Sequence, residues 1–320
     1  MKRLVILSLC AALTFTFASA QSKVYFTKVI TPESLLGIYK ALGVEATGRV
    51  AVKISTGEAG GHNYLKPVLI RDLVDHVSGT IVECNTAYGG KRMKSEDHWA
   101  TIHDHGFDSI FAVDIMDEFG DIRIPVKDKT HIKYNIVGAH LANYDFMINL
   151  AHFKGHAMGG FGGVLKNASI GVASSNGKAY IHSAGYTAST KDLWSHVDDQ
   201  DGFLESMAAA AQAVHEYFGG KVLYINVLNN ISIDCDCSSH PKAPELQDIG
   251  IMASTDPVAL DKACLDIIYG IKPEPGNDNT SLIKRIEKQH GGHIIDWGEK
   301  IGLGTKQYTL IDLDKKRTRK

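Results

Sequence analysis

The sequence predicts an α/β fold: an open, mostly parallel sheet with helices on both faces, arranged in two lobes. Three times between residues 24 and 105, an apolar strand is followed by a loop and then by a helix. Strands that alternate with helices form parallel sheets, because each helix carries the chain back across one face. The predicted strands are apolar along most of their length, which is typical of strands buried on both faces. A chain of 320 residues is long enough to bury such a core.

Cap and turn residues mark where the elements begin and end. The helix of residues 32–42 starts with Thr31 as N-cap and Pro32 at the first helical position, and Asp256 and Pro257 open a later helix in the same way. The predicted strands are residues 24–29, 49–55, 80–83, 145–151, 221–228 and 249–253, with further strands between 109 and 137. The predicted helices are residues 32–42, 65–78, 94–105, 203–218 and the one that begins at 257.

The two ends of the chain predict export and a charged tail. Residues 1–20 contain two positive charges, an apolar run too short to span a membrane and a small-x-small cleavage signal, which is the pattern of a secretory signal peptide. We therefore expect cleavage near Ala20 and a periplasmic or secreted protein. Residues 21–314 would form a single α/β domain, and residues 315–320 a solvated basic tail. No other segment approaches the ~18 apolar residues of a membrane span, so no transmembrane segment is expected.

Charge and cysteine content narrow the class of protein further. Lys and Arg number 34 and Asp and Glu 36, so no overall positive field indicates a nucleic-acid partner, and none is expected. Four cysteines follow the signal peptide, too few for a fold built on disulfides. Cys84 and Cys264 lie in or beside apolar runs and are expected to be inert core residues.

The most distinctive stretch follows the strand of residues 145–151. His152 and His156 project to the same side whether the segment is extended or helical. Glycines after them free the backbone to expose amide N–H groups, which together with Lys166 would bind a small anion such as a carboxylate or phosphate. These glycines are Gly159, Gly160, Gly162 and Gly163. The stretch lacks the Gly and the Ser/Thr that flank the Lys of a P-loop. The alternative is an ordinary flexible glycine loop with surface histidines.

Cys235 and Cys237 form the second unusual motif. With His240, or with His156 brought in by the fold, they would make a ligand set suited to zinc or iron, with an open position if only three protein ligands bind. Two alternatives stay open. A disulfide between these cysteines would close a small strained ring that exchanges readily with thiols, although the flanking aspartates raise the pKa of a thiol and so oppose reactivity. The pair could also have a purely structural role.

Three motifs carry a resemblance to a known family. They are the stretch 152–171, the run Asp-Cys-Asp-Cys at 234–237 and the stretch DIGIMASTDPVA at 248–259. Together they resemble the uncharacterised iron–sulfur-centre proteins known as domain of unknown function 362, and the likeness extends from about residue 24 to 270. Similar members often carry an inserted ferredoxin segment with four cysteines after the glycine loop. Between 171 and 203 this chain has no cysteine, so no 4Fe–4S cluster is expected.

A weaker similarity covers only about a dozen residues. The spacing of His156 and Lys166, with glycines between them, is similar to the glycine loop of nickel-pincer lactate racemase. This resemblance would make His156 a metal ligand or an acid/base group and Lys166 the tether of the cofactor, with nickel as the metal.

Several polar residues elsewhere are weaker candidates. Those that end or follow predicted strands, where a ligand would bind, are Lys53, Glu83, Asn85 and Tyr88, although each is individually more typical of a hydrogen-bonded loop residue. His98 belongs to the polar helix of residues 94–105 and is expected to face solvent.

These observations favour a metal-dependent enzyme that acts on a small anionic substrate. The glycine loop and Lys166 would hold the anion, His152 and Lys166 would be catalytic, and one zinc, iron or nickel ion would complete the site. Its ligands would be His156, Cys235, Cys237 and His240. The alternatives are a non-catalytic protein that binds a metal or an anion, and a thiol–disulfide protein that uses Cys235 and Cys237.

Overall fold

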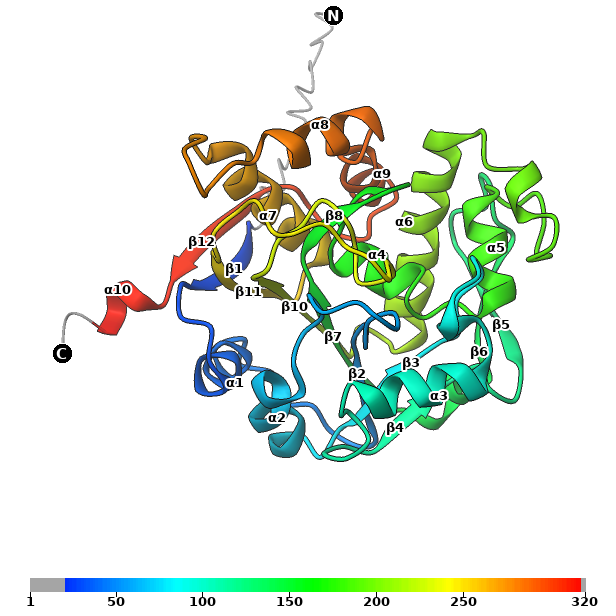
Figure 1. The fold of residues 1–320 in the computed structure, drawn as a ribbon, viewed down its shortest axis with the longest axis horizontal. Coiled ribbons are helices and arrows are strands. Elements are labelled where there is room, and N and C mark those ends of the chain that lie inside the picture. Colours follow the sequence, from blue (N-terminus) through cyan, green and yellow to red (C-terminus); the bar gives the residue numbers. More distant parts are fainter. Residues whose placement is uncertain (1–20, 318–320) are drawn as a thin grey trace, which may run out of the picture.

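One central sheet runs through residues 21–317, the part of the chain that the computed structural model describes (Figure 1). Its strands are β1 (Ser22–Thr27), β2 (Val50–Lys53), β3 (Thr80–Glu83), β4 (Val113–Ile115), β7 (Phe146–His152), β10 (Val222–Leu228), β11 (Gly250–Ser254) and β12 (Tyr308–Asp312). They lie in the order β12-β1-β11-β10-β7-β2-β3-β4. Neighbours are parallel except that β11 runs antiparallel to β10 and β1. The open, mostly parallel sheet predicted from the sequence is confirmed.

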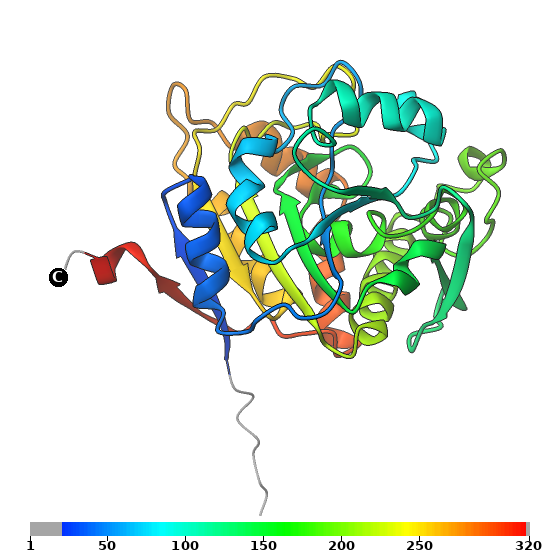
Figure 2. The ribbon, with the colours of Figure 1, turned by 90° about the horizontal axis from the view of Figure 1, so that it is seen from below.

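Helices cover both faces of this sheet. They are α1 (Pro32–Ala41), α2 (Pro67–His76), α3 (Ser95–Asp104), α4 (Val164–Ser169), α5 (Ser175–His182), α6 (Gln200–Tyr217), α7 (Pro257–Gly270), α8 (Thr280–Lys288), α9 (His293–Lys300) and α10 (Asp314–Arg317). Apolar residues of α1, α2 and α3 share one buried cluster with the sheet, and those of α4 to α9 share another. Figure 1 shows the first group below the sheet, and Figure 2, seen from below, shows α1 and α2 in front of the strands.

Strand β7 shows how the sheet divides the core. Ile148 and Leu150 belong to the cluster with α1, α2 and α3, whereas Met147 and Ala151 belong to the opposite cluster. Successive side chains of a strand point to opposite faces, so both faces of β7 are buried. Asn149 is a buried polar residue within the strand, and its side-chain amide donates to the carbonyl of Val164 (2.9 Å). This hydrogen bond ties α4 to the strand beneath it.

Both predicted helix caps are confirmed. Thr31 caps α1 in a reciprocal capping box, and the Asp256 carboxylate accepts a hydrogen bond from the N–H of Val258 (2.9 Å) at the start of α7. Helix α6 starts at residue 200 rather than at 203, because the Asp199 carboxylate accepts from the N–H of Gly202 (2.9 Å) and caps the helix earlier.

Two short hairpins of the described chain lie outside the central sheet. They are β5 (Asp121–Pro125) with β6 (Tyr134–Gly138), and β8 (Lys154–His156) with β9 (Gly160–Gly162). The second hairpin contains Gly159, Gly160 and Gly162 of the predicted glycine loop, and α4 begins two residues after it. The polypeptide therefore passes from the end of β7 through the hairpin into the helix that carries Lys166.

The strand order creates a crevice at the carboxyl edge of the sheet. Strands β2 and β7 are parallel neighbours, but the chain leaves β2 for α2 on one face and leaves β7 for α4 on the other. Ligand sites of open α/β sheets form where consecutive connections diverge in this way. The connection from β10 to β11, residues 229–249, brings the Cys-x-Cys motif to this edge.

The predicted signal peptide, residues 1–20, and the last three residues of the basic tail lie outside the described residues. Residues 315–317 of that tail form the end of α10. Among residues 21–317, no helix is both long enough and apolar enough to cross a membrane.

Candidate functional site

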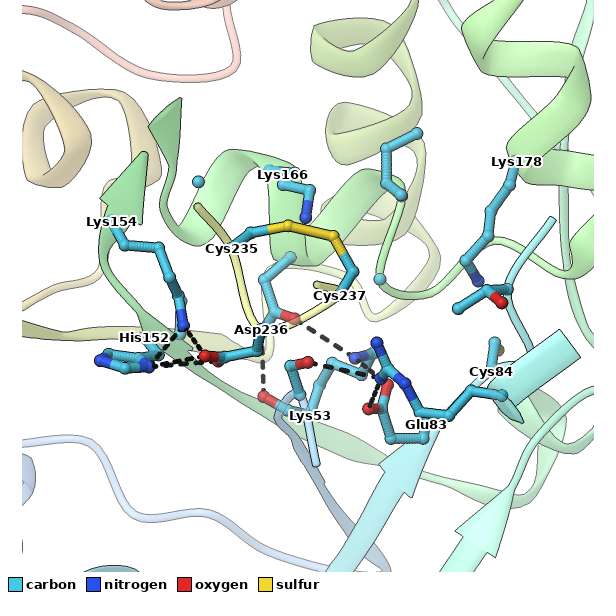
Figure 3. A pocket seen from close by; sticks show the side chains of 18 of the residues that line it. Lys53, Glu83, Cys84, His152, Lys154, Lys166, Lys178, Cys235, Asp236 and Cys237 are labelled. Carbon is cyan, nitrogen blue, oxygen red and sulfur yellow. Dashed lines mark hydrogen bonds and ion pairs between the residues drawn. A yellow bond between two sulfur atoms is a disulfide. The ribbon is translucent and has the colours of Figure 1, made fainter. Parts of the chain in front are cut away.

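A cavity of about 80 Å³ lies at the carboxyl ends of β2, β3 and β7 (Figure 3). By this measure a water molecule needs about 10–15 Å³, so the cavity has room for several heavy atoms. Its charged lining side chains are Lys53, Glu83, Arg92, Lys154, Lys166, Lys178 and Asp236. These are five cations and two carboxylates, a formal excess of three positive charges. Such a lining favours a small anion over a neutral or cationic ligand.

One wall of the cavity is a buried ion network around Glu83. Its carboxylate accepts from the Lys53 amine (2.9 Å) and from the Arg92 guanidinium (3.0 Å). Arg92 also reaches Glu58 (3.4 Å), so this cation is shared between two acids. Burial alone would raise the pKa of Glu83, but Lys53 and Arg92 outweigh it and lower the pKa to about 2. The charges on this wall therefore largely compensate one another.

The opposite wall holds a second buried group, formed by His152, Lys154 and Asp236. The Lys154 amine forms an ion pair with the Asp236 carboxylate and also contacts Nδ1 of His152. Nε2 of His152 lies 2.6 Å from the carbonyl oxygen of Asn229, which can only accept, so Nε2 carries a proton. Both ring nitrogens of His152 are thus engaged, and neither is available to a ligand.

Lys166 differs from the other cations of the cavity. Its amine has no hydrogen-bond or ion-pair partner within residues 21–317, and in Figure 3 it points toward the bridge between Cys235 and Cys237. Burial and the neighbouring Lys154 lower the pKa of Lys166 to about 7, against the opposing effect of Asp236. Lys166 therefore has an uncompensated amine that changes charge near neutral pH.

The structure brings the glycine hairpin and the Cys-x-Cys motif together. Cys235 and Cys237 form a disulfide, and ligand atoms of His156 and both cysteines all lie within 4.8 Å of one another. The sequence left open whether these two motifs meet. They meet because residues 229–249 bring the cysteines to the end of β7, where the hairpin begins.

These three side chains do not fit a metal ion while the disulfide is intact. Two sulfurs bonded to each other are not thiolates, which are the form of cysteine that binds metals. Nδ1 of His156 accepts from the N–H of Gly159 (2.8 Å), so the neutral ring carries its proton on Nε2 and has no spare lone pair on a ring nitrogen. Zinc or iron would fit only after reduction of the disulfide and release of this hydrogen bond.

His240, the fourth predicted metal ligand, is exposed and lies outside this group. Its Nδ1 is 2.9 Å from the Ser239 hydroxyl, with which it shares a hydrogen bond. The structure therefore places three of the four predicted ligands together and leaves His240 at the surface.

The four predicted anion-binding glycines have different roles. Gly162 and Gly163 line the cavity. Gly159 donates its N–H to His156, and Gly160 adopts a left-handed conformation (φ +77°) that turns the hairpin against Ile286. Only the second pair of glycines therefore adjoins a ligand in the cavity.

An internal carboxylate already occupies the backbone donors that follow the glycines. Asp261, on α7, is fully buried and accepts from the N–H groups of Val164 (3.0 Å) and Leu165 (2.9 Å). The side-chain amide of Asn226 donates to the same carboxylate (2.8 Å). Burial raises the pKa of Asp261 to about 6, although these hydrogen bonds oppose the shift. The first turn of α4 is thus capped from within the protein, and a bound anion must rely on side-chain cations.

The weaker sequence candidates divide between the cavity and its surroundings. Lys53, Glu83 and Tyr88 line the cavity. Asn85 does not, because its side chain accepts from Nδ1 of His98 (3.0 Å). The expectation that His98 faces solvent is wrong: the residue is fully buried and helps to fix the loop after β3.

Several charged residues of the site were not predicted from the sequence, among them Arg92, Lys178 and Asp261. Arg92 lies in a loop between glycines and a polar helix, where nothing in the local pattern indicates burial, yet it is 3% exposed. Asp261 did leave a signal, since helical spacing places it on the apolar stripe of α7 with Val258, Leu265 and Ile268. A carboxylate at such a position must find buried partners.

Comparisons with known proteins identify the family. No curated protein matches the chain. The lactate racemase apoprotein from Thermoanaerobacterium thermosaccharolyticum is 13% identical with a TM-score of 0.42, over 78% of this chain and 57% of that one. A protein from Thermotoga maritima is 11% identical with a TM-score of 0.42, over 86% of this chain and 60% of that one. The chain thus spans less than two thirds of the length of either.

The family described as Domain of unknown function (DUF362) matches residues 50–266, more than half of the chain. This range includes the glycine hairpin, the Cys-x-Cys motif and the start of α7, so it covers the motifs that carried the resemblance. The chain belongs to the family Domain of unknown function (DUF362).

Proposed function

We propose that the protein is an exported enzyme that binds a small anion in the cavity and acts on it with the amine of Lys166. The main observation behind this proposal is that the Lys166 amine has no hydrogen-bond or ion-pair partner within residues 21–317. The other charges of the cavity are largely paired. A carboxylate or phosphate oxygen would supply the missing partner and form a charge-assisted hydrogen bond. The predicted signal peptide supports export.

Lys166 can also move a proton. An amine with a pKa near 7 is present in both charge states at neutral pH, so it can hold an anion as a cation and accept a proton as a free amine. His152, also predicted to be catalytic, has both ring nitrogens engaged. We therefore assign proton transfer to Lys166 and leave His152 the task of holding Lys154 and Asp236 in place.

We propose that the site binds a metal ion only when the Cys235–Cys237 disulfide is reduced. His156 and the thiolates of Cys235 and Cys237 would then offer the nitrogen and sulfur ligands that zinc and iron prefer, and the metal would supply Lewis-acid polarisation of the bound anion. Elemental analysis of the reduced protein, beside the Cys235→Ala/Cys237→Ala variant, tests this part. One equivalent of metal that the variant lacks would support it, and equal metal content in both would overturn it.

Anion binding is tested by calorimetric titration with small carboxylates and inorganic phosphate. We compare the native chain with Lys166→Met and with Lys272→Met, whose lysine is exposed in the connection between α7 and α8. A charge-assisted hydrogen bond contributes about 1.5–3 kcal/mol, so Lys166→Met should weaken binding by roughly 10- to 150-fold while Lys272→Met changes nothing. Equal affinities of the native chain and Lys166→Met would overturn the proposed site.

Turnover separates an enzyme from a non-catalytic anion-binding protein. We would incubate the native chain with each anion that binds it but does not bind Lys166→Met. Proton NMR would then show whether the anion changes chemically or exchanges its carbon-bound protons with solvent. Change with native protein alone would support catalysis. Binding without change, under both oxidising and reducing conditions, would leave a binding protein.

A further inference from the structure

A second hollow adjoins the cavity and is lined by one cysteine of the disulfide, Cys237. Its volume is about 410 Å³, and Thr86, Tyr88 and Cys237 line both the hollow and the inner cavity. Ser238 and Ser239 form part of its rim. A molecule in the hollow therefore reaches Cys237 without first passing the buried ion pairs of the inner cavity.

The two cysteines differ in access. Cys237 is partly exposed and lies at the boundary between the hollow and the cavity, whereas Cys235 is 8% exposed and lines the inner cavity alone. Thiol–disulfide exchange requires the attacking sulfur to approach one of the two sulfurs, so access decides which one is attacked. Here only Cys237 is open to a molecule that arrives from outside.

We propose that the Cys235–Cys237 disulfide is a thiol–disulfide exchange centre that a small carboxylate-bearing thiol reduces by attack on Cys237. In the first step, the thiolate of the small molecule bonds to Sγ of Cys237, the bond between the two cysteine sulfurs breaks, and Cys235 leaves as a thiolate. In the second step, another small thiolate attacks the sulfur of the bound molecule and releases Cys237 as a thiolate. Two small thiols are oxidised to one disulfide, and the protein disulfide gains their two electrons.

The inner cavity stabilises the sulfur that leaves. Cys235 departs into a space with a formal excess of three positive charges, toward which the Lys166 amine points (Figure 3). Nearby positive charge favours a thiolate, which makes it a better leaving group. The charged residues of the hollow itself are one acid and one base, Glu58 and Lys91, so the field that attracts a carboxylate on the incoming thiol comes from the adjoining inner cavity. This field is the reason for choosing this class of reductant.

The flanking aspartates, which the sequence indicated would oppose this chemistry, are neutralised by the fold. Asp236 forms a buried ion pair with Lys154 and contacts His152, and Asp234 lies 3.9 Å from the guanidinium of Arg285. Each aspartate therefore has a cation beside it that offsets its negative charge.

Neither of the other two cysteines of the described chain has a thiol ready to resolve a mixed disulfide, although Cys84 also lines the inner cavity. Cys84 is 2% exposed and donates its thiol hydrogen to the carbonyl of Val172 (3.2 Å), and Cys264 is fully buried under β11. Burial raises the pKa of both thiols and keeps them protonated. A second small thiol must therefore complete the reaction.

Two single variants test the order of attack. In Cys235→Ala the thiol of Cys237 remains, and in Cys237→Ala the thiol of Cys235 remains. Both would be mixed with oxidised glutathione, a disulfide that carries carboxylates, and the formation of mixed disulfide would be followed by mass spectrometry. We expect Cys237 to react at least about tenfold faster than Cys235, with equal rates once both variants are unfolded in urea. Equal rates in the folded proteins would overturn the proposal.

The native protein provides the second test. Reduced glutathione would be added anaerobically, the reaction quenched with acid, and the adduct placed on Cys235 or Cys237 by fragment-ion sequencing. An adduct on Cys237 supports the proposed step, whereas an adduct on Cys235 refutes it. Glutathione that reduces the urea-unfolded chain but leaves the folded disulfide intact would also refute it. Neither test depends on anion turnover, so the proposed enzyme and this exchange centre succeed or fail separately.

Discussion

Gly163 has no room for a β-carbon beside Asp261, so Gly163→Ala probes the internal cap of α4 directly. A β-carbon built there would lie 2.3 Å from Oδ1 of Asp261 and 2.7 Å from its Cγ. The backbone of Gly163 is extended (φ −132°), a conformation open to any residue, so the substitution acts through this contact alone. Asp261 is fully buried and must withdraw from α4.

The size of the effect follows from the hydrogen bonds that are lost. Withdrawal of the carboxylate leaves the N–H groups of Val164 and Leu165 without an acceptor in the protein interior. Each such group costs about 1–3 kcal/mol, so Gly163→Ala should lower the free energy of unfolding by about 2–6 kcal/mol. Urea denaturation followed by circular dichroism measures this quantity. Gly162→Ala is the matched control, since its nearest neighbour is the flexible side chain of Lys166 at 3.3 Å.

A double-mutant cycle with Asp261→Ala separates this cause from a general intolerance of alanine. Asp261→Ala alone deprives the same two N–H groups of their acceptor and should be about as destabilising as Gly163→Ala. Because Asp261→Ala also frees the space, adding Gly163→Ala to it should then cost less than about 1 kcal/mol. Strictly additive effects would refute the proposed contact, as would a stability of Gly163→Ala within about 0.5 kcal/mol of the native chain.

Three further predictions follow from burial and charge. The affinity for an unreactive small carboxylate should be full below pH 7 and fall about tenfold per pH unit above it, because Lys166 (pKa about 7) loses the charge that attracts the anion. Titration calorimetry at a series of pH values measures this affinity. In Lys166→Met the affinity should no longer depend on pH in this way. Glu83→Gln leaves two buried cations facing each other and should cost about 3–5 kcal/mol in urea denaturation, against about 0–1 kcal/mol for Asp145→Asn in an exposed pair. Cys84 and Cys264 should resist iodoacetamide in the folded protein and react in urea.

Each of these has a result that contradicts it. An affinity that rises with pH would remove Lys166 from anion binding. Equal losses of stability from Glu83→Gln and Asp145→Asn would show that the network around Glu83 is solvated rather than buried. Labelling of Cys84 in the folded chain would mean that the cavity wall opens.

The sequence predicted the architecture well because the relevant signals are local. The largely apolar run of β7, the cap at Thr31 and the Asp-Pro pair that opens α7 each depend on a few consecutive residues. Interactions between residues so close in sequence form regardless of how the rest of the chain is arranged. The α/β class and most element positions could therefore be derived from pattern alone.

The site was only partly predictable because its energetics depend on residues distant in sequence. Lys166 and the Cys-x-Cys pair stood out by composition, but the partner that caps α4, Asp261, is 97 residues from Val164. Whether a lysine is paired depends on such contacts: Lys154 has an acid beside it, and Lys166 has none within the described chain. The local sequence pattern shows that a charged side chain is present, but it does not show which distant charged residue forms an ion pair with it.

The connection between β10 and β11 has a consequence for how this family can diversify. These strands are antiparallel neighbours, and two residues would suffice to join them, yet the chain uses residues 229–249. Closing a loop of that length instead of a tight turn costs only about 2 kcal/mol in chain entropy. The reactive sulfurs thus lie in a long connecting loop rather than in a strand of the sheet. Replacing this loop with another would change the chemistry at the cavity. The hydrogen bonds between the strands of the sheet would stay the same.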